Sequence, residues 1–170
     1  MTAAALLGGL APDLSLYLMA GWHLMVLGTD AEIVFRQLYY SDRWQAIFAV
    51  DNSFILWGIG LAIAVSARSA WAVALTGSAL LHLALDFPLH HDDARRHFWP
   101  ITDWVFESPI SYWDPAHYGG IVGLIEAALV VVLLVVLWRR FQGAVARSVI
   151  VASGTLQVAP AIIWAFVFSS

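Results

Sequence analysis

Residues that could bind a metal ion or move a proton are concentrated in the stretch HLALDFPLHHDDARRH, residues 82–97. It contains four of the six histidines and three of the twelve acidic residues. His82 and Asp86 are four residues apart, so on a helix they share one face, one turn apart. Imidazole and carboxylate groups together suit divalent transition metals, and a bound metal can activate water. The stretch therefore predicts a metal site, with zinc the favoured ion.

The remaining candidate residues fall into three groups. The predicted metal ligands are Asp13, His82, Asp86, His90, His91, His97 and His117. The predicted general bases are Asp51, Asp92 and Glu126. Arg95 and Arg96 either position an anionic headgroup or neutralise the neighbouring Asp92 and Asp93. Which of the four histidines after Asp86 bind the metal stays open.

The elements that must position these residues are membrane helices. Hydrophobic residues make up 61% of the chain and charged residues 12%, whereas soluble proteins carry about 25% charged residues. The sequence predicts an all-α integral membrane protein with a single domain, 1–170, built as a bundle of five transmembrane helices. The predicted spans are residues 3–28, 47–66, 69–87, 119–138 and 146–168. Residues 29–46 are expected to form a polar linker, and 88–118 an ordered, aromatic-rich loop that caps the bundle.

Composition also excludes several classes of site and partner. The chain has no cysteine, so disulfides and thiolate metal sites are ruled out. Its net charge of −4 and the lack of a basic stripe give no nucleic-acid footprint. The density of arginines near helix ends favours a cytoplasmic N-terminus and an external 88–118 loop.

The position of Asp13 depends on the shape of the first span. A break at Gly8-Gly9 and Pro12 would let Asp13 face a water-filled cleft and join the site, with Glu126 and Gln157 lining that cleft. A straight helix would place Asp13 near the membrane midplane instead, where an unpaired carboxylate is costly. The sequence favours the break.

Three of these segments resemble the signature blocks of the bacterial inner-membrane proteins known as membrane-bound metal-dependent hydrolases. The blocks are GLAPD at residues 9–13, HLALD at 82–86 and FWPITD at 98–103. The resemblance implies a location in the bacterial inner membrane and metal or catalytic roles for Asp13, His82 and Asp86. Two family histidines are missing, because residues 51–53 read Asp-Asn-Ser where the family has Thr-His-Ser and residues 2–3 read Thr-Ala.

The leading hypothesis is a membrane-embedded, metal-dependent hydrolase that acts at the bilayer surface on a lipid-like or phosphorylated amphiphile. One alternative is a cation or proton conductor that uses Asp13, Glu126, His82 and Asp86 as a relay. Another is a haem or redox-metal protein with His23, His82 or His117 as axial ligands. An enzyme would gather its ionisable groups at one end of the bundle, whereas a conductor needs them spaced across the bilayer.

Overall fold

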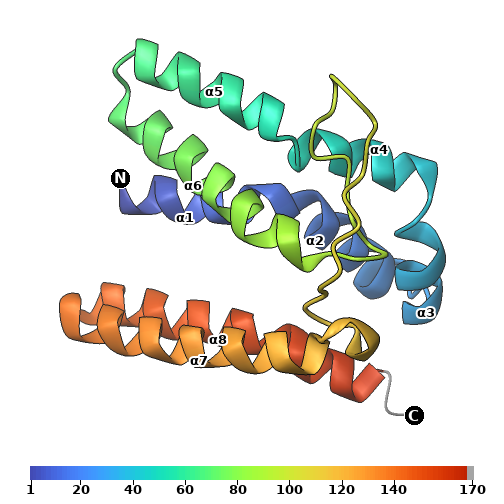
Figure 1. The fold of residues 1–170 in the computed structure, drawn as a ribbon. Coiled ribbons are helices and arrows are strands. Elements are labelled where there is room, and N and C mark those ends of the chain that lie inside the picture. Colours follow the sequence, from blue (N-terminus) through green and yellow to red (C-terminus); the bar gives the residue numbers. More distant parts are fainter. Residues whose placement is uncertain (168–170) are drawn as a thin grey trace. The chain divides into compact units, whose positions relative to one another are not determined.

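The computed structural model describes the backbone of residues 1–167 and the side chains of residues 1–157, and all regular secondary structure in this part is helical (Figure 1). The α-helices are α1 (Thr2–Leu10), α2 (Leu14–Gly21), α3 (Ala31–Ile33), α4 (Asp42–Asp51), α5 (Phe54–Ser66), α6 (Ala70–Asp86), α7 (Gly119–Arg140) and α8 (Ala144–Val167). The 3-10 turns are η1 (Ala11–Asp13), η4 (Phe87–Leu89) and η5 (Pro115–His117), and the π-helical turns are η2 (Trp22–Val26) and η3 (Val34–Leu38). The chain divides into two compact units, residues 1–111 and 112–170. The single domain stays a prediction.

Four helical segments in the described residues are long and apolar enough to span a membrane, which indicates a membrane protein. They are Thr2–Val26, Asp42–Ser66, Ala70–Leu89 and Gly119–Arg140. The second begins at Asp42, five residues before the predicted start at 47. The fifth predicted span, 146–168, ends outside the described residues, so it stays a prediction, although α8 is helical as far as Val167.

The first span is interrupted at Pro12, as predicted. Proline has no N–H to donate, and the α-helix tightens there into the 3-10 turn η1. The Pro12 carbonyl accepts a hydrogen bond of 3.0 Å from Nδ2 of Asn52, a fully buried side chain at the α4–α5 junction. The interruption is therefore held in place by a neighbouring helix, and it is a tightened turn within one continuous segment.

Helix α1 packs closely along α6, which runs beside α5 (Figure 1). Gly8 makes this close approach possible, because a Cβ atom at Gly8 would lie only 2.0 Å from the carbonyl oxygen of Leu75. Gly9, the next residue, has no atom within 4 Å of an added Cβ.

Replacing Gly8 by alanine is therefore expected to lower stability by about 1–3 kcal/mol, because the α1–α6 interface must open. The Gly9→Ala variant is the matched control, and it should be neutral or slightly stabilising because alanine is the better helix former. Thermal unfolding in detergent measures both. Equal melting temperatures for the two variants would contradict this packing.

Residues 29–46, which the sequence predicted to form a polar linker, are largely helical and partly buried. They form α3, η3 and the first turns of α4, because several of their apolar side chains are buried. Val34, Tyr39 and Trp44 pack with Phe48 and Ala20 in one hydrophobic cluster. The charged residues of this segment are exposed: Asp30, Glu32, Arg36, Asp42 and Arg43.

The irregular segment 88–111 is fastened to the end of α6 and to the α4–α5 junction, which it crosses in Figure 1. The His97 carbonyl accepts a bond of 2.8 Å from the amide of Phe54, and the Trp99 carbonyl accepts one from the Ser53 hydroxyl. Farther along, the amide of Ser108 donates to the His90 carbonyl at 2.9 Å. These bonds fix the backbone that carries the histidines and Arg95.

The second unit contains the α7–α8 hairpin. Gly154 of α8 lies against Leu134 of α7, whose nearest atom would be 3.0 Å from an added Cβ. Gln157 Nε2 donates a hydrogen bond of 2.9 Å to Glu126 Oε1. This hydrogen bond joins α7 and α8 and engages both of the residues that the sequence predicted to line a cleft.

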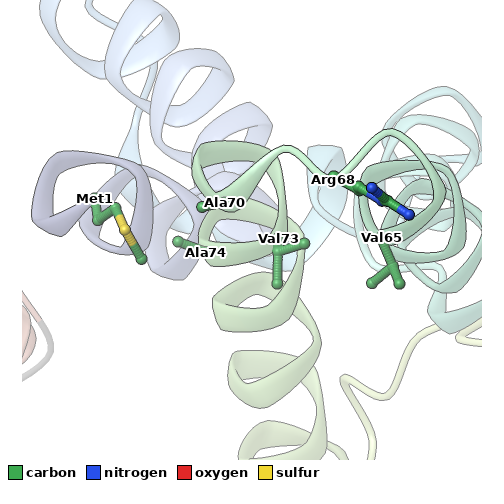
Figure 2. Close-up of a pocket in the computed structure, with 6 residues that line it drawn as sticks. All are labelled: Met1, Val65, Arg68, Ala70, Val73 and Ala74. Atoms are coloured by element: carbon green, nitrogen blue, oxygen red, sulfur yellow. The ribbon is translucent and has the colours of Figure 1, made fainter.

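A shallow apolar pocket of about 360 Å³ lies at the α5–α6 turn (Figure 2). Its lining residues are Met1, Val65, Arg68, Ala70, Val73 and Ala74. Arg68 is the one ionisable side chain among them, and the turn is at the opposite end of α6 from His82 and Asp86. This pocket therefore offers little chemistry.

Candidate functional site

His90 bridges two carboxylates just beyond the end of α6. Its Nε2 lies 2.8 Å from Oδ2 of Asp86, and its Nδ1 lies 2.8 Å from Oδ2 of Asp93. Burial lowers the pKa of His90, but the bonds to the two carboxylates outweigh that effect and raise the pKa to about 9. His90 is therefore a buried imidazolium at neutral pH.

Asp13 and His82 form a second pair, and His82 lies one helical turn before Asp86 in α6. His82 Nε2 lies 3.6 Å from Oδ2 of Asp13, and each side chain is 22% exposed. The 3-10 turn at Pro12 places Asp13 at this position, while His82 comes from the last two turns of α6. Unlike His90, this pair remains reachable from outside.

Arg95 faces the other carboxylate oxygen of Asp13. Its Nη1 lies 3.8 Å from Oδ1 of Asp13, and its Nη2 donates a bond of 3.2 Å to the Tyr39 hydroxyl. The guanidinium carbon sits 4.5 Å from the centre of the Phe48 ring, and the side chain is 3% exposed. Among the residues whose side chains are described, the Nε of Arg95 has no hydrogen-bond partner. A guanidinium has five donors, so this one keeps unused donor capacity inside the protein.

These side chains form one ionic cluster, since Asp86 also interacts electrostatically with His82 and Arg95. The members of the ionic cluster are Asp13, His82, Asp86, His90, Asp93 and Arg95. Three carboxylates face the charges of Arg95 and the protonated His90, so carboxylates outnumber cations in the cluster. The arrangement suits proton transfer and binding of a small polar group.

His97 and His91, both predicted ligands, are held by backbone carbonyls. His97 packs against the rings of Phe54 and Phe87, and its Nδ1 donates to the Arg95 carbonyl at 2.9 Å. Burial lowers the pKa of His97 to about 4, against the opposing effect of that bond. His91 Nδ1 donates to the Ser108 carbonyl at 2.7 Å. His97 is therefore neutral in the folded protein at neutral pH, and its anchored Nδ1 fixes the orientation of the ring.

Three further predicted residues of the first unit have contacts outside the ionic cluster. Asp51 ends α4, and its carbonyl accepts a bond from the Trp57 indole at 2.7 Å. Asp92 is exposed, and Arg96 pairs with Asp103 at 3.1 Å near the surface. Arg95 is thus the better placed of the two predicted headgroup arginines.

The other two predicted residues, His117 and Glu126, belong to the second unit. His117 Nδ1 lies 2.6 Å from Oδ2 of Asp114, and Glu126 accepts the bond from Gln157. Their predicted roles as metal ligand and general base are not tested by these contacts.

The described residues contain no group of three His, Asp or Glu side chains arranged to hold one metal ion. Both ring nitrogens of His90 face carboxylates, so His90 would have to lose its proton and one of these partners to bind a metal. The side chains in this arrangement form a charge-paired network, and the predicted zinc stays a prediction.

Sequence reasoning missed several members of the site. Asp93 follows His90 by three residues, and this spacing is a signal for a contact between the two side chains. The sequence predicted Asp92 as a general base instead. Tyr39 and Asn52 carry no local signal, because they meet Arg95 and Pro12 only through the tertiary fold. Burial raises the pKa of Tyr39, so its phenol stays neutral and can orient Arg95.

Comparisons of the chain with protein-family models, with curated proteins and with solved structures found no match. The likeness to the metal-dependent hydrolases therefore rests on the three short motifs alone.

Proposed function

We propose that this protein is a membrane-embedded hydrolase that acts at the bilayer surface on an amphiphile with an anionic group. The observation that carries the proposal is the position of the Asp13 carboxylate between the His82 imidazole and the Arg95 guanidinium. A base paired with a carboxylate, next to a cation with unused donors, is a minimal arrangement for hydrolysing an anionic ester.

In this proposal His82 is the general base and Asp13 orients it. With Nε2–H directed at Asp13, the Nδ1 of His82 takes a proton from water. The resulting hydroxide attacks the scissile carbon or phosphorus, and the leaving group receives the proton as its bond breaks. Arg95, paired with Asp13, supplies a fixed positive charge that favours an anionic group beside the ionic cluster.

The surroundings of His82 favour an amphiphilic substrate. Leu81 and Leu85 flank His82 on the exposed side of α6, and Leu14 and Tyr17 are exposed just after Asp13. Because α6 and α2 belong to candidate membrane spans, lipid would cover these side chains. An acyl chain can lie there while its headgroup reaches the ionic cluster.

A bound zinc ion is a second, separately testable part of this proposal. The resemblance implies Asp13, His82 and Asp86 as the ligands, but the described residues form no three-ligand group, so no step of the proposed reaction is assigned to a metal. Elemental analysis of purified wild-type protein and of His82→Ala tests this part, and an optical spectrum of the same sample tests the haem alternative. We further propose an inner-membrane location with the 88–118 loop external, from the family resemblance and the arginine distribution.

Proton or cation conduction is less well supported by the first unit. Helices α1 and α5 and the first twelve residues of α6 contain no ionisable Asp, Glu, His, Lys or Arg. The ionic cluster therefore lies at one end of α6, and no relay continues along these helices.

Replacing His82 by alanine is expected to lower the rate of hydrolysis about 100-fold, because the general base is lost. The assay uses p-nitrophenyl esters, phosphates and phosphodiesters that carry acyl chains, presented in detergent micelles. His91→Ala is the control and should keep full activity, since His91 is bonded to the Ser108 carbonyl and is not placed in the proposed reaction. The proposal would be contradicted if wild-type protein hydrolysed none of these substrates, or if folded His82→Ala kept full activity.

A further inference from the structure

The turn between α7 and α8 carries three arginines without a nearby acidic residue. Arg139 and Arg140 end α7, and Arg147 lies in the first turn of α8. No Asp or Glu occurs anywhere from residue 127 to residue 170. The positive charge of this turn is therefore not neutralised by neighbours in the sequence.

The turn is also held in a defined shape. Gln142 Nε2 donates to the Arg139 carbonyl at 3.3 Å, and Gln142 Oε1 accepts a bond of 3.0 Å from Arg147 Nη2. The guanidinium of Arg147 is stacked on the Trp138 ring, 4.6 Å from its centre. We call this group, Trp138, Arg139, Arg140, Gln142 and Arg147, the arginine turn.

The helix that leads to the arginine turn needs a lipid environment. Helix α7 contains an 18-residue window with a mean hydropathy of 2.9, and no residue of that window is buried inside the protein. Leu133, Val136 and Leu137, in the two turns before the arginines, are exposed. The arginine turn therefore lies where the hydrocarbon region ends, and tryptophan is common at that depth.

We propose that the arginine turn binds the phosphate headgroup of an anionic phospholipid whose acyl chains lie along the exposed apolar side of α7. Arg139 and Arg140 supply charge, while Arg147, fixed by Gln142 and Trp138, supplies a preoriented guanidinium. The continuous apolar surface below the arginines selects a lipid over a soluble phosphate, which would gain nothing from it. This site involves no residue of the ionic cluster, so it stands or falls separately from the proposed hydrolysis.

Binding of fluorescently labelled phosphatidylglycerol to the detergent-solubilised full chain, followed by anisotropy, tests the proposal. Phosphatidylglycerol should bind more tightly than phosphatidylcholine. Each arginine near a membrane surface contributes about a fivefold factor in affinity, so Arg139→Gln with Arg140→Gln should weaken binding about 30-fold. Arg147→Gln alone should weaken it about fivefold, and added salt should reduce the wild-type preference.

Arg68→Gln is the matched control, because Arg68 also lies in a turn between two apolar helices but has no second arginine beside it. This variant should bind like the wild type. Circular dichroism of every variant verifies that its helices are intact, and Arg147→Gln provides an independent test if the double variant fails to fold. Equal affinity for the two lipids, unchanged affinity in the folded variants, or displacement of the lipid by an equal concentration of inorganic phosphate would overturn the proposal.

Discussion

Replacing Arg95 by glutamine is expected to lower the free energy of unfolding by about 3–5 kcal/mol, because removal of one partner leaves buried charge uncompensated. Arg95 is 3% exposed and lies between Asp13, the Tyr39 hydroxyl and the Phe48 ring. Its loss would leave Asp13 without its nearby guanidinium, with His82 as the remaining partner. It would also remove the hydrogen bond that the Tyr39 hydroxyl accepts from Arg95. Thermal or denaturant unfolding in detergent measures the effect.

Arg96→Gln is the control for this prediction. Arg96 is the next residue and carries the same charge, but its partner Asp103 has a side chain that is 76% exposed. Pairs of this kind contribute about 0–1 kcal/mol. Equal destabilisation by the two variants would show that charge alone, and not burial, determines the effect.

The Arg95→Gln variant also allows a test of the coupling between Arg95 and Asp13. If the two charges compensate each other, combining Arg95→Gln with Asp13→Asn should cost less than the sum of the separate changes. Asp13→Asn also separates the two sequence-based interpretations of Asp13. A role in the site requires lower activity in a protein that still folds. If Asp13 is instead only a costly carboxylate within the membrane, its replacement leaves activity unchanged and raises the melting temperature.

The helical spans could be predicted from the sequence because their signals are local. Apolar runs of the required length locate the helices. Pro12 interrupts the first span because proline lacks an N–H, an effect that does not depend on which helices pack beside it. The same local logic put His82 and Asp86 on one face of α6. Burial of residues 29–46 was missed because Val34 and Phe48 gain their partners only when α2 and α4 meet.

The site could be predicted only in part because its members are oriented by tertiary contacts. An arginine in a polar loop is usually exposed, and nothing beside Arg95 in the sequence indicates that Tyr39 and Phe48 will enclose it. Similarly, His90 looks like a metal ligand when only its residue type and spacing are considered. Its bonds to Asp86 and Asp93 become apparent only after the turn at Pro88 is known.

Raising the pH from 6 to 9.5 is expected to destabilise the first unit by roughly 3 kcal/mol at most, because His90 loses its proton. The pKa of His90 is about 9 in the folded chain, above the ordinary value of 6.5. The stabilisation is therefore fully present below pH 6.5, where both states are protonated, and it is lost as the pH rises through 9. The interactions lost are those with Asp86 and Asp93, since a neutral imidazole can donate to only one of them.

Melting temperatures in detergent across this range, for wild type and for His90→Gln, measure the contribution. The wild type should lose stability toward pH 9.5, and His90→Gln should be less stable at pH 6 with a nearly flat profile. Tyrosines ionise near pH 10 or above and so contribute little within the range.

His91→Gln is the control, because it removes the adjacent histidine and should keep the wild-type slope. His97 acts in the opposite direction, since its pKa is lowered to about 4 and its stabilisation is lost as the pH falls below 6.5. A slope toward pH 9.5 that survives His90→Gln would mean that another group titrates there, and the bridge between the two carboxylates would not be its cause.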